Sequence, residues 1–240
     1  SAPPRGRGGA PRAGGARGGG GGAGRRGGGG GGAPPPRRTC AGGRFFAGAG
    51  LADPFKASVL GAGAMAQHVH LLALQYGICV ALHTDHANRA LLPWVDALIH
   101  HSEGYYAATK KTLFSSHMID LSEEPLADNL TTCAAYLARL AKIEMSLEIE
   151  LGVTGGEEDG VGRDDVHNAR LYTQADDVLA AYDMLSPLGH FSVAASFGNV
   201  HGVYAPGHVH LRPEILRESQ DMVAATRHTG PDPMNFVFHG

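Results

Sequence analysis

The 240-residue sequence contains few cysteines, and its first forty residues contain no acidic and no aromatic residue. The three cysteines (Cys40, Cys79 and Cys133) form no C-x-x-C pair, which argues against a disulfide framework and against a thiolate zinc site. No stretch has the roughly 18 uninterrupted apolar residues of a typical membrane span, so we expect no membrane partner. The N-terminal arginines are not followed by an apolar run, so a secretory signal is not expected.

Charge and glycine are unevenly distributed along the chain. Residues 1–40 contain 17 of the 36 glycines and 8 of the 20 basic residues, whereas residues 41–240 contain all 23 acidic residues. The first segment has too few apolar side chains to offset the entropy of ordering the chain, and we predict that it is disordered. The second has the length and composition of one globular domain. Its acidic character argues against duplex nucleic acid as a partner, and we expect a cytoplasmic protein.

The Gly/Arg/Pro-rich segment allows two interpretations. An RGG-like arm would bind single-stranded RNA through charge and arginine stacking, with the protein acting as an RNA-binding or scaffold protein. Such arms usually interleave aromatic residues, and none occurs before Phe45. The other interpretation is a linker or leader with no binding role.

Beyond residue 40, short β-rich runs alternate with helical patterns. The predicted strands cover residues 78–83, 115–121, 147–151, 191–197 and 235–239, each apolar or β-branched enough for a buried parallel strand. The predicted helices cover residues 126–142, residues 175–185 after a capping box at residues 173–176, and a third helix from Pro213 to about Ala225. Parallel strands need crossover connections, so this alternation predicts a parallel α/β fold.

Polar residues stand at or just beyond the carboxyl ends of all five predicted strands. These residues are Asp85, His86, Asp120, Glu150, His201 and His239. A β/α barrel builds its chemistry on that rim, whereas an open doubly wound sheet binds its ligand at one switch point. Five strands that all contribute polar tips therefore favour the barrel.

Three histidines from three strand ends match the ligand set of a catalytic zinc ion with an open fourth position. His86, His201 and His239 are neutral ligands, so the ion would keep its full charge to polarise a carbonyl group. A single histidine near a strand end is more often a hydrogen-bonded structural residue. We interpret the other histidines as surface or structural: His68 and His70 in a helical stretch, His100 and His101 near a helix end, and His208 and His210 in a loop.

Carboxylates on the same rim offer acid–base chemistry. Asp85 could exchange a proton with a substrate hydroxyl, and the acidic segment at residues 154–160 could be a mobile lid that carries a general base. A solvated acidic turn is the simpler interpretation of that segment. Asp120 and Glu150 could hold a second cation or form structural salt bridges.

Five sequence motifs together resemble one enzyme family. ALHTDHANRALLPWVDALI, FSSHMIDLSEEPL, LEIELGVTGGEEDGV, AASFGNVHGVYAPG and NFVFHG are similar to the motifs of class II, zinc-dependent fructose-bisphosphate aldolases, in the same order, across residues 42–240. The resemblance implies a (β/α)8 TIM barrel and, in the full-length protein, a homodimer. It also implies cleavage of fructose 1,6-bisphosphate, a sugar bisphosphate substrate, into dihydroxyacetone phosphate and glyceraldehyde 3-phosphate in glycolysis.

The resemblance also implies roles for individual residues. His86, His201 and His239 correspond to ligands of the catalytic zinc, and Asp85 to the residue that exchanges a proton with the C4 hydroxyl. Glu158 corresponds to the carboxylate that moves a proton on the dihydroxyacetone phosphate carbon. Asp120, Glu150 and Glu157 correspond to ligands of a second, divalent or monovalent, cation. Gly202 and Gly240 correspond to residues whose backbone contacts the substrate.

The sequence departs from the family at both ends. The Gly/Arg tract stands where the family has its first two barrel strands, and Cys40-Ala41-Gly42-Gly43 replaces a Ser-Asn-Gly-Gly motif. The sequence ends at Gly240, where the family continues into a phosphate-binding loop and a last strand. We therefore expect an incomplete barrel with the metal half of the site and little or no activity. A related tagatose 1,6-bisphosphate aldolase remains an alternative, because the stereochemistry at C4 is not readable from these motifs.

Overall fold

The computed structural model describes residues 50–152, 155–158, 161–162, 172–201 and 210–239. For residues 155–158, 161–162 and 200–201 it describes the backbone alone. All of the described helices and strands belong to the unit Ala33–Gly240.

The main sheet has five parallel strands in the order β1-β2-β3-β6-β8. Its strands are β1 (His83–Thr84), β2 (Ser116–Ile119), β3 (Ser146–Leu151), β6 (Phe191–Ala195) and β8 (Phe236–Val237). Successive strands are joined through α3 (Leu92–Thr109), α4 (Leu126–Leu140), α5 (Ala175–Leu185) and α6 (Glu214–Arg227). This confirms the parallel α/β prediction. Within the described residues β1 and β8 do not pair with each other, so the barrel is not closed.

The central strand β3 shows how the sheet separates an apolar face from a polar face. Its residues alternate, as the period of two in a strand requires. Leu147, Ile149 and Leu151 belong to the hydrophobic core, whereas Glu148 and Glu150 point to the opposite face, and all five are buried. The helices therefore pack on one face, and the other face carries buried carboxylates. Those carboxylates need partners, because burial of a charge without one is costly.

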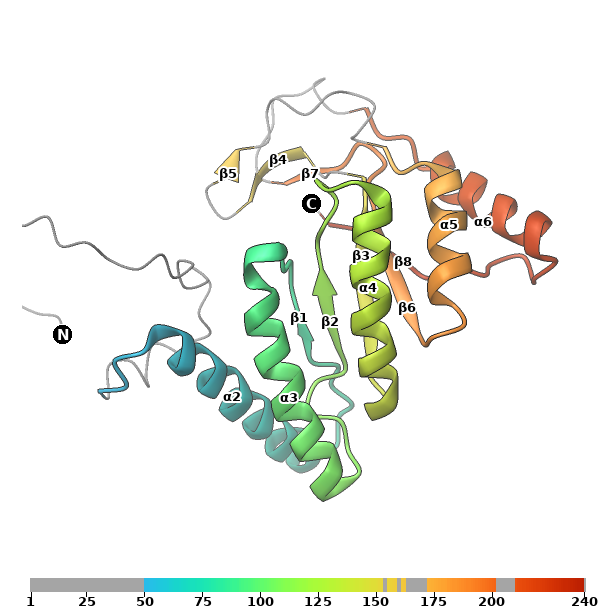
Figure 1. Ribbon diagram of the computed structural model, residues 1–240. Helices are drawn as coiled ribbons and strands as arrows, with labels where there is room; N and C mark the ends of the chain where they lie inside the picture. Colours follow the sequence, from blue (N-terminus) through green and yellow to red (C-terminus); the bar gives the residue numbers. More distant parts are fainter. Residues whose placement is uncertain (1–49, 153–154, 159–160, 163–171, 202–209, 240) are drawn as a thin grey trace, which may run out of the picture. The chain divides into compact units, whose positions relative to one another are not determined.

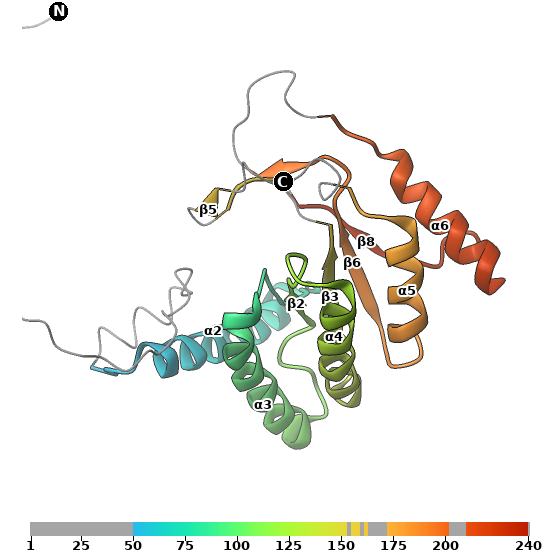
Figure 2. The same ribbon diagram turned by 45° about the horizontal axis from the view of Figure 1, so that its top comes forward.

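The helix-facing core holds the layers together. Helix α4 contacts β3 and α5, and α5 contacts α6, so these helices form a layer that follows the sheet (Figures 1 and 2). The largest side chains with no exposed surface come from both layers: Leu98, Ile99, Leu137, Leu140 and Leu185 from the helices, and Ile119, Leu147 and Ile149 from the strands. This core positions the carboxyl ends of β1, β2 and β3, from which the polar residues extend.

Helix α2 (Pro54–Tyr76) precedes the sheet and packs on α3. Asp53 caps it by accepting hydrogen bonds from the backbone of Phe55 and Lys56, and Gly77 ends it in the left-handed conformation. One 18-residue window of α2 has a mean hydropathy of 1.3, so by length and composition this helix could cross a membrane. A third of that window is buried within the protein. The search for an uninterrupted apolar run therefore missed this helix. A single helix of this kind is weak evidence for a membrane span.

The strand and helix predictions are largely confirmed, with several corrections. The predicted strand at residues 78–83 is almost entirely wrong, because β1 begins at His83 and ends at Thr84. The predicted capping box is also wrong. Gln174 is the N-cap of α5 and makes no side-chain cap, whereas the Thr173 hydroxyl donates to the Leu151 carbonyl and accepts from the Ser196 amide. His100 and His101 lie in the middle of α3 rather than near its end.

Residues 155–158 form a strand where a Gly-flanked acidic loop was predicted. β4 (Gly155–Glu158) pairs with β5 (Val161–Gly162) and with β7 (Val200–His201) in a second, three-stranded sheet. Gly156 is the register partner of His201. The backbone of the GGEE motif is therefore joined to the backbone of the NVHG motif by strand pairing.

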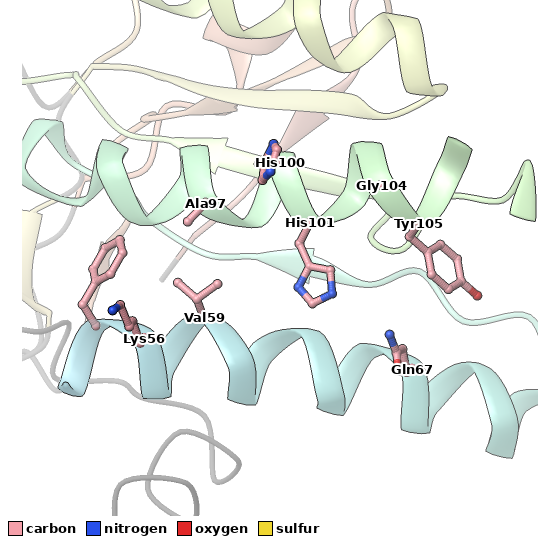
Figure 3. Close-up of a pocket in the computed structure, with 9 residues that line it drawn as sticks. Lys56, Val59, Gln67, Ala97, His100, His101, Gly104 and Tyr105 are labelled. Atoms are coloured by element: carbon pink, nitrogen blue, oxygen red, sulfur yellow. The ribbon is translucent and has the colours of Figure 1, made fainter. Parts of the chain in front are cut away.

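A groove of about 640 Å³ runs between α2 and α3 (Figure 3). Val59 points into it from α2 and His101 from α3, and Lys56, Gln67 and Tyr105 lie along its length. The groove is lined by helix residues and contains none of the polar residues that follow the strands. It is therefore separate from the rim on which catalytic chemistry was predicted.

Gly198 follows β6 in a conformation that another residue would adopt only with strain, and we expect Gly198→Ala to destabilise the protein by about 2 kcal/mol or more. Its φ is +93°, and an added Cβ would lie 2.1 Å from the backbone oxygen of His210. Gly104 in α3 is the matched control, because an added Cβ there meets nothing within 4 Å. Gly104→Ala should stabilise the helix by about 0.5–1 kcal/mol. Urea unfolding followed by circular dichroism measures both, and equal effects would contradict this account.

Candidate metal centre

Four polar residues from four parallel strands meet at the carboxyl edge of the main sheet. His86 follows β1, Asp120 follows β2, Glu150 lies near the end of β3, and His239 follows β8. Parallel strands align their carboxyl ends at one edge, which explains why residues up to 153 positions apart in sequence come together. The structure thus brings together five of the predicted site residues, these four and Asp85.

Two buried carboxylates hold one side of the His86 ring. His86 Nδ1 lies 3.2 Å from Asp120 Oδ2 and 3.2 Å from Glu150 Oε2. Carboxylates only accept hydrogen bonds, so Nδ1 carries the ring's proton and donates it. Asp120 also accepts from the backbone and the hydroxyl of Ser122. Burial alone would raise the pKa of Asp120, but the hydrogen bonds from His86 and Ser122 outweigh it and lower that pKa.

A third buried carboxylate holds the far side of the His239 ring. Glu148 Oε1 accepts a hydrogen bond from His239 Nε2 at 2.8 Å, and the other oxygen of Glu148 lies 3.6 Å from His83 Nε2. The hydrogen bond with Glu148 raises the pKa of His239, although burial acts in the opposite direction. Burial lowers the pKa of His83. The side-chain amide of Asn199 donates to the backbone carbonyl of His239 and fixes the position of this residue.

The near nitrogens of the two rings face each other. His86 Nε2 and His239 Nδ1 are 3.1 Å apart, and Asp85 Oδ1 lies 3.8 Å from the first and 3.9 Å from the second. Because the far nitrogen of each ring donates to a carboxylate, both near nitrogens present lone pairs. Two lone pairs at this distance repel each other unless a cation lies between them, either a proton or a metal ion.

The donor set fits zinc. Neutral imidazole nitrogens with a carboxylate beside them are preferred zinc ligands. Two nitrogens that bind one tetrahedral zinc ion at ~2.0–2.1 Å lie about 3.3 Å apart, close to the separation of the two rings. Buried carboxylates on the far nitrogens are the usual outer partners of metal-binding histidines. His86, His239 and Asp85 form one group able to hold a cation, and His86, Asp120 and Glu150 form a second.

The other predicted site residues are described only in part or not at all. The backbones of Glu157 and Glu158 lie in β4 and that of His201 in β7, and their side chains lie outside the described residues. Gly202, Gly240 and the Gly/Arg tract also lie outside them. The roles of these residues and an RNA-binding arm therefore remain predictions.

Sequence reasoning missed two residues of this centre. Glu148 carries a signal that could have found it, since it is two residues before Glu150 on a strand and must share its face. Asn199 carries a weaker signal. It directly follows a glycine in the left-handed region, and its oxygen accepts from the backbone of Phe197, which is the local geometry of a turn.

Comparison with known proteins identifies the family of this chain. Residues 42–240 match the family model described as fructose-bisphosphate aldolase class-II. The chain is 55% identical over 202 residues to fructose-bisphosphate aldolase of Haemophilus influenzae, and 54% identical over 202 residues to fructose-bisphosphate aldolase class 2 of Escherichia coli K12. Each alignment covers 83% of this chain and 56% of the relative, so the chain spans about half the length of these relatives.

A solved structure agrees with this assignment. The crystal structure of fructose-bisphosphate aldolase from Campylobacter jejuni superposes with a TM-score of 0.69 at 52% sequence identity, over 82% of this chain and 55% of that one. The open five-stranded sheet thus corresponds to part of a longer fold. The family match, the sequence identity and the superposition agree: the chain belongs to the class-II fructose-bisphosphate aldolase family.

Proposed function

We propose that the protein catalyses zinc-dependent aldol cleavage of fructose 1,6-bisphosphate to dihydroxyacetone phosphate and glyceraldehyde 3-phosphate, and the reverse condensation. One observation supports this most directly: two histidine nitrogens face each other at 3.1 Å with a carboxylate oxygen beside both. The identity of the substrate is inferred from the relatives, which are named fructose-bisphosphate aldolase. We further propose a homodimer, as the family resemblance implies, and a cytoplasmic location, as the composition suggests.

We propose the following roles for residues of this chain. His86 and His239 would hold zinc through the facing nitrogens, with His201 as the proposed third ligand. A zinc ion held there would supply Lewis-acid polarisation of the substrate's ketone group. Asp85 is about half exposed beside the two nitrogens, where a carboxylate can exchange a proton with the C4 hydroxyl. Glu158 is the proposed second proton carrier.

Other residues have proposed roles in binding a second cation and the substrate. Asp120 accepts a hydrogen bond from His86 at 3.2 Å, and Glu150 Oε2 lies at the same distance from His86 Nδ1. These contacts support an orienting role as well as the proposed role in binding a second cation with Glu157. Gly202 and Gly240 are the proposed backbone contacts to the substrate.

Zinc content and aldol cleavage, measured on the same preparation, test the proposal. Elemental analysis should find one zinc ion per 240-residue chain after dialysis, because the facing nitrogens form a specific site. A coupled assay should detect cleavage of fructose 1,6-bisphosphate that is lost on chelation and restored by zinc. Since we expect a low rate from these residues, the assay needs protein concentrations near that of the substrate.

Two outcomes would count against the proposal. A chain that retains no zinc would contradict the metal site and indicate that a proton lies between His86 and His239. Faster cleavage of tagatose 1,6-bisphosphate than of fructose 1,6-bisphosphate would contradict the substrate.

A further inference from the structure

Glu148 contacts both histidines on the polar face of the sheet. It lies in the middle of β3, between its register partners Met118 on β2 and Ser192 on β6, and its side chain is almost fully buried. Its two oxygens divide between His239 Nε2 at 2.8 Å and His83 Nε2 at 3.6 Å. His83 is held in turn by the hydroxyl of Ser116, 2.7 Å from its Nδ1.

We propose that Glu148 is a positioning residue that fixes His239 as an Nδ1 metal ligand. A neutral imidazole carries one proton, on either Nδ1 or Nε2. Because the Glu148 carboxylate can only accept, it holds that proton on Nε2 and leaves the Nδ1 lone pair directed at His86 Nε2, 3.1 Å away. This inference rests on the proposed metal site and adds to it the residue that sets the tautomer of one ligand.

The arrangement around His86 supports this role. Asp120 and Glu150 contact His86 Nδ1, so the two rings are held from opposite ends: His86 presents Nε2 and His239 presents Nδ1. Removal of the Glu148 carboxylate would free the His239 ring to turn or to change tautomer. A ring with its proton on Nδ1 could not bind a metal ion through that atom.

The burial of Glu148 also argues that it has a specific role. A buried carboxylate costs several kcal/mol unless it is paired, and an apolar residue would fill this position in the middle of a strand more readily. Its register partners Met118 and Ser192 carry no charge. Within the described residues, the titratable groups in contact with Glu148 are His239 at 2.8 Å and His83 at 3.6 Å.

Glu148→Gln tests the inference with two readouts on the complete 240-residue chain. Glutamine keeps the size of the side chain but can donate as well as accept. We expect zinc affinity, measured by competition with a chromophoric chelator, to fall 10–100-fold, the usual effect of losing an outer partner of a ligand. Long-range ¹⁵N–¹H spectra of the zinc-free chains should show His239 protonated on Nε2 in the parent and as a mixture of tautomers in the variant.

Glu103→Gln is the matched control, because it makes the same chemical change in α3, where Glu103 pairs with Arg139 away from the sheet edge. Its zinc affinity should stay within about twofold of the parent value, since solvent screens the lost charge. Circular dichroism of all three chains reports whether they fold.

Two results would overturn the inference. One is parent-like zinc affinity together with Nε2 protonation in Glu148→Gln. The other is the absence of a proton on His239 Nε2 in the zinc-free parent, which requires no variant and so is independent of any folding defect. Absence of zinc binding by the parent would instead contradict the proposed function, and the tautomer measurement would still test the inference.

Discussion

Replacement of His86 with alanine should lower the zinc affinity of the chain by more than 100-fold. Loss of an outer partner of a ligand typically costs 10–100-fold, and loss of the ligand itself should cost more. Two buried carboxylates also lie 3.2 Å from His86 Nδ1 and fix the direction of its Nε2. Competition with a chromophoric chelator measures the affinity, and elemental analysis after dialysis measures the zinc retained.

His68→Ala is the control for the loss of an imidazole ring. His68 lies on the exposed side of α2, and alanine is compatible with a helix there, so the zinc affinity should not change. The His86→Ala chain must also be shown to fold, because Asp120 loses a hydrogen-bond donor and Glu150 loses a nearby imidazole N–H. A folded His86→Ala chain that binds zinc like the parent would rule out the centre described above.

The sequence predicted the elements whose local pattern and tertiary packing agree. Residues 175–185 form α5 with the predicted bounds, since Val178 and Leu185 recur on one face and Asp176 and Asp177 occupy the first turn. The strands β2, β3 and β6 were predicted from apolar and β-branched runs that are buried in the middle of the sheet. The position of His86, Asp120, Glu150 and His239 at one edge followed from the parallel arrangement of these strands.

Other features depend on contacts that no local pattern contains. Among the described strands β1 pairs with β2, and it is two residues long although residues 78–82 are apolar enough to extend it. Thr173 was expected to cap a helix but instead joins β3 to β6 through Leu151 and Ser196. β4 has two glycines, which disfavour a strand, and it forms through pairing with β5 and β7.

The sequence also could not predict which carboxylate contacts which histidine in the metal centre. A histidine at a strand end can bind a metal ion through either nitrogen, and the choice depends on which group contacts the other nitrogen. For His86 that group is Asp120 or Glu150, and for His239 it is Glu148, 91 residues away in the sequence. The sequence could predict that these residues share an edge or a face, but not which carboxylate accepts from which ring.

The buried histidine of β2 should make the stability of the protein depend on pH. His117 has no exposed surface, its Nδ1 is 2.8 Å from the Thr84 hydroxyl, and within the described part of the chain its Nε2 has no hydrogen-bond partner. Burial lowers the pKa of His117 from 6.5 to about 3, and the nearby His83 adds to this effect. The folded protein therefore keeps His117 neutral in a pH range in which the unfolded chain binds a proton.

The sign of the effect follows from proton linkage. Between about pH 6.5 and pH 3 the unfolded chain binds the additional proton, so the stability contributed by neutral His117 is complete above pH 6.5 and is lost as the pH falls. The slope is at most about 1.4 kcal/mol per pH unit, which predicts a loss of about 2 kcal/mol between pH 7 and pH 5. The other histidines also titrate in this range, so the parent curve alone does not isolate the effect.

His117→Gln isolates it, because glutamine can still contact Thr84 but does not titrate. Urea unfolding of both chains at pH 7, 6 and 5, with a chelator present to remove the pH dependence of metal binding, gives the difference in free energy of unfolding. We expect any stability advantage of the parent to shrink, or to reverse, as the pH falls. Parallel pH profiles would mean that His117 gains a proton without unfolding, which would require a partner for Nε2 and a more open packing of β2 against the helices.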